Sequence, residues 1–175
     1  MSGETGLIFV IGIMAGVVAI VLVMKAINKD GKSRTQYDER QLAVRGKAYM
    51  YGFYTALIAC VVLLIMNGLE VGTEALGKTG YFIPIFAGTV AQVTYSIFHD
   101  AYEGLNTNMS RLIVVMAMIG GLNFAVSIIN LVRGELYKGG ELQLSFLNLL
   151  CGLLFVVIAV EMLVKRAMDK REGGE

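Results

Sequence analysis

Residues 112–132 read LIVVMAMIGGLNFAVSIINLV, an apolar stretch without a single Asp, Glu, Lys, Arg or His. A helix needs about 20 predominantly apolar residues to cross the hydrocarbon core of a bilayer. A strand of a membrane β-barrel would instead alternate apolar and polar residues over about 10 positions. This stretch therefore predicts a membrane-spanning helix.

Four more stretches are predominantly apolar, and the composition of the whole chain agrees with them. Only 17% of the 175 residues are charged and 56% are hydrophobic, whereas a soluble domain carries about 25% charged residues. The spans leave no room for a soluble domain, so residues 1–175 are expected to form one membrane domain. We expect an all-α polytopic membrane protein with five spans, at about residues 5–27, 48–69, 79–98, 112–132 and 142–164.

The first span differs from a secretory signal peptide, which begins with basic residues and ends at a small-residue cleavage site. Residues 1–5 contain Glu4 and no lysine or arginine, and the apolar run ends at Met24 and Lys25. We therefore expect this span to be retained.

Lysine and arginine are distributed unevenly between the two sides that five spans would create. Twelve of the 15 fall in residues 25–47, at Arg111 and in residues 165–175, while three fall in the opposite connections. Cytoplasmic loops retain Lys and Arg, so we expect an outer N-terminus, a cytoplasmic linker at 28–47 and a cytoplasmic tail at 165–175. The short outer connections predict two hairpins that form a four-helix bundle, with the first span at its flank.

Charged residues gather beside two of the predicted spans on the basic side. Residues 37–47 predict a short helical lead-in to the second span, with acidic residues in the first turn where they complement the helix dipole. We interpret this region as an orientation anchor that pairs electrostatically with the loop after the third span. The alternative is a docking site for a cytoplasmic partner or a nucleotide-binding subunit. The candidate docking residues are Asp38, Glu39, Arg40, Arg45, Lys47, His99, Asp100 and Glu103.

The one histidine of the chain raises the question of a metal site. His99 and Glu103 lie four residues apart and would share a helix face. A zinc site needs three or four ligands, and no second ligand motif accompanies this pair. We expect no metal and no cofactor.

Three segments resemble parts of known proteins: Asp38-Glu39-Arg40-Gln41, the Ala48 region after it, and Asp100-Ala101-Tyr102 at the end of the third span. The chain resembles a group of small bacterial multi-spanning membrane proteins of uncharacterised function, which have a cytoplasmic Asp-Glu-Arg-Gln motif just before a membrane helix. The resemblance implies a bacterial cytoplasmic (inner) membrane. It supplies no catalytic residues.

Polar side chains recur at intervals of three and four residues in two predicted spans, and this spacing places them on one helix face. Such side chains commonly hydrogen-bond across helices, contributing about 0.6 kcal/mol on average. The alternative is that they line a narrow cavity for an ion or a small solute. The candidate cavity residues are Thr89, Gln92, Ser96, Asn123, Ser127, Asn130 and Asn148.

Charged groups near the membrane centre would favour transport, and the predicted spans offer one candidate at their border. Glu161 lies at the inner boundary, four residues before Lys165. We expect an ion pair along the helix, or side chains that reach to the membrane surface.

Small residues mark candidate helix contacts, because close backbone approach supplies packing energy in lipid. Gly12 and Gly16 form a pair in the first span, and Ala117, Gly121 and Ala125 share a face of the fourth. We expect these residues to make helix–helix contacts, either within one chain or between copies of it.

The function classes follow from these features. The sequence has no phosphate-binding glycine loop, nucleophile elbow or metalloprotease motif, so we expect no enzyme. The basic residues are interleaved with acids and indicate orientation, not nucleic-acid binding. We favour an accessory, regulatory or self-assembling membrane subunit whose partners are the bilayer and its own copies or another membrane protein. A small oligomeric channel or transporter is the alternative, and a lipid-modifying enzyme using His99 ranks third.

Overall fold

The computed structural model describes Met14 and residues 18–172. The described chain is helical apart from its connections and one small β-hairpin. It begins with a short apolar helix, Val18–Ile27. The labelled elements that follow are α2 (Glu39–Gly68), α3 (Thr73–Leu76), the 3₁₀ helix η1 (Gly77–Phe82), α4 (Ile83–Phe98), α5 (Met109–Val132), β1 (Tyr137–Lys138), β2 (Glu141–Leu142), the 3₁₀ helix η2 (Leu144–Phe146) and α6 (Leu147–Glu172).

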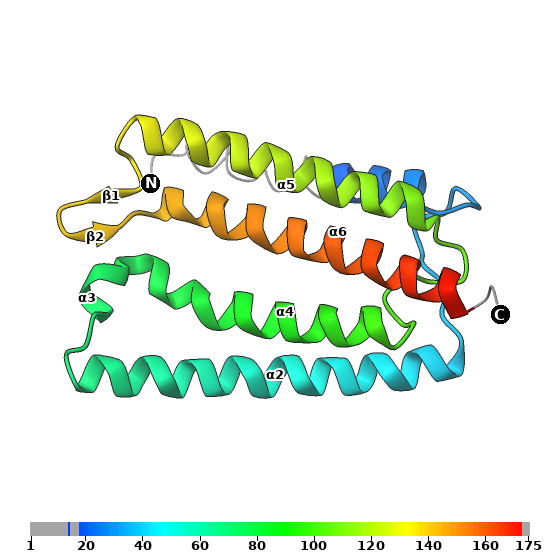
Figure 1. Ribbon diagram of the computed structural model, residues 1–175, viewed down its shortest axis with the longest axis horizontal. Helices are drawn as coiled ribbons and strands as arrows, with labels where there is room; N and C mark the ends of the chain where they lie inside the picture. The colour runs from blue at the N-terminus through cyan, green and yellow to red at the C-terminus, as the bar shows by residue number, and fades with distance from the viewer. Residues whose placement is uncertain (1–13, 15–17, 173–175) are drawn as a thin grey trace.

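The long helices form a row in the order α5, α6, α4, α2 (Figure 1). The helices α2 and α4 pack as one antiparallel hairpin, α5 and α6 as a second, and α4 and α6 join the two. The predicted four-helix bundle is therefore open: α2 and α5 lie at opposite edges and do not close on each other. In lipid no hydrophobic force drives the edges together, so a row can persist where water would favour a closed bundle.

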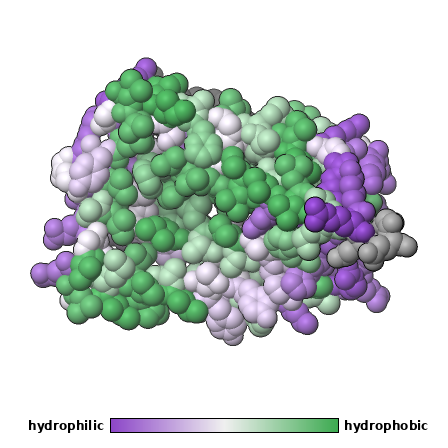
Figure 2. All heavy atoms as spheres, in the orientation of Figure 1, coloured by the Kyte–Doolittle hydropathy of each residue, from purple (hydrophilic) through white to green (hydrophobic). Residues whose placement is uncertain are grey.

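Four helical segments are long and apolar enough to cross a membrane: Glu39–Gly68, Thr73–Phe98, Met109–Val132 and Leu144–Arg171. Figure 2 shows hydrophobic side chains across the middle of the molecule and hydrophilic ones gathered at its two ends. This distribution confirms the prediction of an apolar helical protein compatible with a membrane. Of the first predicted span, Val18–Ile27 is a described helix, and it is shorter than a full span.

The ends of the helices differ from the predicted ends for local reasons. Capping at Asp38 starts α2 at Glu39, so the lead-in and the second span form one continuous helix of 30 residues. Residues 79–82 belong to η1, and α4 begins beside Pro84, which is favourable in a first turn. Residues 137–142 form a hairpin whose turn uses Gly139 and Gly140 at positive φ, and α6 continues past residue 164 to Glu172.

The two helical hairpins each have a crossing point made of glycine. A Cβ added to Gly52 would lie 2.8 Å from the Gly88 carbonyl oxygen, and one added to Gly88 would lie 2.7 Å from the Gly52 carbonyl oxygen. In the second hairpin, a Cβ on Gly120 would lie 3.4 Å from the Gly152 carbonyl oxygen. The close approach of α2 to α4 therefore depends on the absence of side chains at both positions.

A buried apolar cluster lies near one end of the row. The Val18–Ile27 helix contributes Ile27, which is 3% exposed, and α6 contributes Met162, which is fully buried. The other buried members are Val93, Ile97, Leu112, Ile113 and Ile158. We call this end, made of residues 25–47, 99–111 and 165–172, the basic end.

We predict that Gly52→Leu lowers the stability of the helical hairpin formed by α2 and α4. The new side chain would meet the α4 backbone, which cannot move aside as a flexible side chain could, and overpacking of this kind costs about 1–3 kcal/mol. Thermal unfolding in detergent measures the loss. Gly68→Leu is the matched control, because an added Cβ at this α2 position meets nothing within 4 Å; equal unfolding temperatures for the two variants would contradict the prediction.

Candidate functional site

Two connections that are distant in sequence pair at the basic end. Residues 28–38 lead into α2, residues 99–108 join α4 to α5, and we call them together the loop pair. The Lys29 N–H donates to the Asn106 carbonyl at 2.7 Å, and the Leu105 N–H donates to the Gln36 carbonyl at 2.8 Å. Each connection therefore supplies hydrogen-bond partners for backbone groups of the other.

Buried amides complete this pairing. The Asn106 Oδ1 accepts from the Gln36 N–H at 2.9 Å. Its Nδ2 donates to the Arg34 carbonyl at 3.0 Å and to both carboxylate oxygens of Asp30 at 3.1 Å. The Asn28 side chain, 1% exposed, donates to the Lys32 carbonyl at 2.8 Å. Buried polar groups with all these partners fix one arrangement of the loop pair.

Gly104 lies at a close approach of the two loops. A Cβ at this position would overlap the Thr35 side chain. The Gly104 N–H donates to the Thr107 hydroxyl at 3.2 Å. Glycine is therefore required at position 104, because any side chain there would overlap the other loop.

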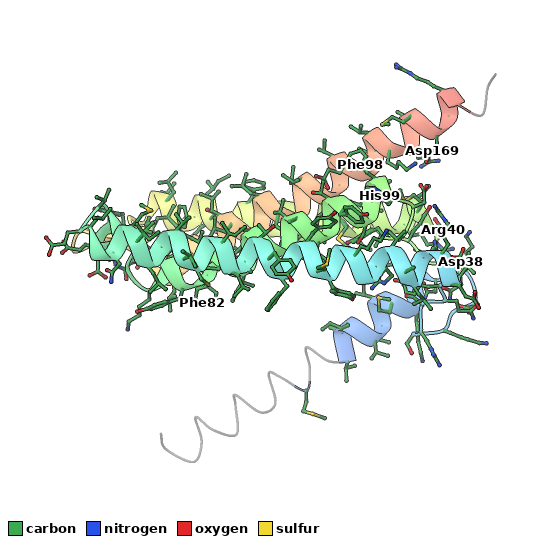
Figure 3. All side chains as sticks on the ribbon, turned by 90° about the horizontal axis from the view of Figure 1, so that it is seen from below. Asp38, Arg40, Phe82, Phe98, His99 and Asp169 are labelled. Atoms are coloured by element: carbon green, nitrogen blue, oxygen red, sulfur yellow. The ribbon has the colours of Figure 1, made fainter. Side chains whose placement is uncertain are left out.

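The Asp-Glu-Arg-Gln motif has a defined structural role. Asp38 is the N-cap of α2, and its carboxylate accepts from the Gln41 N–H at 2.6 Å while the Gln41 Oε1 accepts from the Asp38 N–H at 3.3 Å. The Gln41 Nε2 then donates across to the carbonyls of Asp100 at 2.9 Å and Glu103 at 3.1 Å. One residue thus completes the cap of α2 and holds the loop after α4. Figure 3 shows Asp38, Arg40 and His99 at this end of the molecule.

Asp100 connects three of the helices. It adopts a left-handed backbone conformation with φ of 57° directly after α4. Its carboxylate lies 2.8 Å from the Lys165 Nζ of α6 and 3.6 Å from the Arg40 guanidinium of α2. Lys165 also contacts Asp169 at 2.6 Å. These charges are partly exposed, so the pairs contribute modestly and mainly orient α6 against the loop.

The other candidate docking residues divide into engaged and exposed ones. Arg45 donates to the Ala101 carbonyl at 3.2 Å and lies over the Tyr37 ring at 4.2 Å, so it faces the loop pair. His99 stacks on Tyr95 with ring centroids 3.9 Å apart. The side chains of Glu39 and Lys47 are exposed. In the part of the chain that the structure describes, no group of three or more His, Cys, Asp or Glu residues is placed to hold a metal ion.

The polar stripes of the third and fourth predicted spans do not meet, because α6 lies between α4 and α5 (Figure 1). The stripe residues bond to their own chain segment: Thr89 to the Ile85 carbonyl at 2.7 Å and Asn123 to the Ile119 carbonyl at 2.9 Å. Ser96 and Asn148 likewise donate to the carbonyls of Gln92 and Ser145. Ser127 is buried, and Gln92 and Asn130 are half-buried.

The candidate packing residues of the fourth span face outward. Ala117, Gly121 and Ala125 are exposed, and an added Cβ on Gly121 meets nothing within 4 Å. The adjacent Gly120 instead faces α6. Gly12 and Gly16 of the first span lie outside the described residues.

Sequence reasoning overlooked one polar contact between apolar helices. The Thr94 hydroxyl of α4 lies 2.7 Å from the Glu161 Oε1 of α6. Lys165 pairs with Asp100 and Asp169, so the expected ion pair between Glu161 and Lys165 does not form. Thr94 falls outside the three- and four-residue spacing of the α4 stripe, and only the packing of α4 on α6 connects it to Glu161.

The comparisons with known proteins identify no relative of this chain. No protein-family model, curated protein or solved structure matches the chain. The candidate site therefore rests on the geometry of the basic end and of the α4–α6 contact.

We predict that Gln41→Leu loosens the loop pair. The substitution leaves the Asp100 and Glu103 carbonyls without their donor, and loss of a hydrogen bond at a partly buried site costs about 0.5–1.5 kcal/mol. Faster amide hydrogen exchange across residues 99–108 measures the change. Gln143→Leu, which removes exposed hydrogen bonds at the other end of the row, is the control and should leave that exchange unchanged. Unchanged exchange in Gln41→Leu would refute the role given to this residue.

Tyr102 provides a prediction about pH. Burial is the main cause that raises the pKa of this phenol from 10.0 to about 12. A raised pKa in the folded state gives stability that is present below the unfolded pKa of about 10 and is lost as pH rises through the folded value. The free energy of unfolding should therefore fall more steeply above about pH 10 in the wild type than in Tyr102→Phe. Parallel curves for the two proteins would contradict the assignment.

Proposed function

We propose that the chain is a non-enzymatic subunit of a larger helical assembly in the bacterial cytoplasmic membrane, with the basic end on the cytoplasmic side. The assembly is built from copies of this chain or from this chain and another membrane protein. The observation that carries the proposal is the open row of helices. At one edge α2 packs against α4, and only 6% of the residues in its most apolar stretch are buried.

The opposite edge supports the same proposal. The α5 face with Ala117, Gly121 and Ala125 is exposed and carries small residues at intervals of four. Such faces let a second helix approach closely, which is how helices associate in lipid. In the part of the chain that the structure describes, both edge helices thus keep an exposed face for a further helix.

The basic end supports a structural role over catalysis. Polar and charged side chains there already have partners within the chain. Gln41 donates hydrogen bonds to two carbonyls and Arg45 to a third, and Asp100 forms ion pairs with two cations. An acid–base catalyst needs a side chain within reach of a substrate proton. The loop pair uses its polar groups to hold α2, α4 and α5 together.

The alternative is a small channel or transporter that uses the polar stripes of α4 and α5. Its path would require the two stripes to line one cavity. The intervening α6 and the hydrogen bonds of Thr89, Ser96 and Asn123 to their own helices favour the subunit proposal.

Purification in a mild detergent, with mass determination of the intact complex, tests the proposal. We expect a defined oligomer or a stoichiometric partner, and Gly121→Leu should shift the population toward the lone chain, because the larger side chain keeps a second helix away. Gly68→Leu is the control, since that glycine is also helical and open but lies at the end of α2. A monodisperse monomer for the wild type would overturn the proposal.

A further inference from the structure

A polar pocket lies at the basic end, where the start of α5 meets the last turns of α6. Its volume is about 280 Å³, which suits a small polar group. Residues 108–110 line it together with four charged side chains, Lys29, Arg166, Glu103 and Asp169. Figure 3 shows Asp169 on the last turns of α6. Two cations and two carboxylates therefore share one pocket, and their charges cancel when all four are ionised.

The cations of this pocket keep their capacity for a ligand. In the part of the chain that the structure describes, no ion pair joins Lys29 or Arg166 to a carboxylate. The Arg166 guanidinium donates one N–H to the Ser110 hydroxyl at 3.0 Å, and a guanidinium has five N–H donors. An anionic group that enters the pocket therefore displaces no ion pair of either cation.

Glu103 shows that the acidic side of the pocket favours a cation. Burial is the largest cause that raises the pKa of this half-buried carboxyl. Lys29 and Arg166 lower that pKa, but Asp169 and Asp100 raise it. The two cations therefore compensate the charge of Glu103 only in part. A further positive group beside Glu103 would stabilise its carboxylate.

An apolar groove continues from this pocket toward the middle of the molecule. Its volume is about 350 Å³, and it lies between the Val18–Ile27 helix and α5. Ser110 lines both the pocket and the groove, and the other lining residues of the groove are Ala26, Ile27, Arg111, Val114 and Val115. Along α5 the groove therefore reaches about one helical turn, or about 5.4 Å, further from the basic end than Ser110 does.

Hydrogen bonds hold the two walls of this groove together. The Arg111 guanidinium donates to the Ala26 carbonyl at 3.0 Å, and the Asn108 N–H donates to the Ile27 carbonyl at 3.1 Å. The groove therefore exists without a ligand, and binding costs little ordering of the chain.

The pocket and the groove together fit an amphiphilic ligand. A headgroup with one negative and one positive group complements a pocket that has both signs of charge, and an acyl chain complements the apolar groove. We propose that they bind one phospholipid whose headgroup carries a phosphate and a primary amine. The phosphate lies at Lys29 and Arg166, the ammonium lies at Glu103, and one acyl chain lies in the groove. This inference rests on the membrane location in the proposed function, and not on the assembly proposed there.

Other headgroups complement this pocket less well. An anionic headgroup without an amine suits a purely basic pocket, whereas here Glu103 and Asp169 would face its negative charge. Quaternary ammonium groups such as choline bind over aromatic rings, and among the described residues no aromatic side chain lines the pocket. A primary ammonium donates three hydrogen bonds, which carboxylate oxygens accept.

Lipid binding to the purified full chain in detergent tests the site. Native mass spectrometry measures the affinities for phosphatidylethanolamine, phosphatidylcholine and phosphatidylglycerol with identical acyl chains. We expect phosphatidylethanolamine to bind about tenfold more tightly than the other two, as one charged hydrogen bond allows. Equal affinities for the three lipids would overturn the proposal. Equally tight binding of glycerophosphoethanolamine, which has the same headgroup and no acyl chains, would also overturn it, because the ligand would then be a soluble phosphate ester.

Substitutions in the pocket separate the roles of its charges. Glu103→Gln should remove the preference for phosphatidylethanolamine over phosphatidylcholine, whereas Arg166→Gln should weaken both lipids by a similar factor, because both carry the phosphate. Glu39→Gln and Lys47→Gln are the matched controls, since they remove exposed charges of the basic end that do not line the pocket. A preference that survives in Glu103→Gln would refute the site.

The oligomeric state in the same spectra keeps this proposal distinct from the proposed function. A monomer that prefers phosphatidylethanolamine would overturn the assembly and support the lipid site. An oligomer without a headgroup preference would support the assembly and overturn the lipid site.

Discussion

The mutual satisfaction of backbone groups by the two connections at the basic end is the constraint on which the rest of the structure depends. Residues 28–38 and 99–108 bond to each other through backbone groups and through the side chains of Asn28 and Asn106. Gln41 of α2 adds two bonds to the second connection. These bonds hold the start of α2 beside the connection between α4 and α5.

Packing along the row has a different origin. Within the hairpins, glycines at Gly52, Gly88, Gly120 and Gly152 let backbones approach, and dispersion contacts then hold the helices. Between the hairpins, α4 and α6 meet through the apolar cluster and through the Thr94–Glu161 contact. The junction between the hairpins therefore combines apolar packing with one polar contact between side chains, whereas the glycine crossings bring backbones together.

Much of the fold could be predicted from the sequence, because runs of apolar residues with the length of a bilayer leave few alternatives. The periodicity could not show which face of a helix meets a neighbour in the same chain: Gly120 faces α6, whereas the face with Gly121 points outward. The arrangement of helices was also beyond reach, since it depends on which helices pack together, and α6 packs on α4 as well as on its sequence neighbour α5. Charge in the motif at Asp38 suggested ion pairs with the loop after the third span; Arg40 and Asp100 form one, but Gln41, an uncharged amide, makes the hydrogen bonds between the two regions.

Gly104 has a consequence for how this sequence can change over time. Its missing side chain makes space for Thr35, which is far away in the chain but adjacent in the loop pair. Any larger residue at position 104 would also meet the Gln36 carbonyl oxygen, at 2.5 Å from its Cβ, so a smaller residue at position 35 would not be enough to make room for it. Position 104 is therefore restricted to glycine for as long as the two loops keep this spacing.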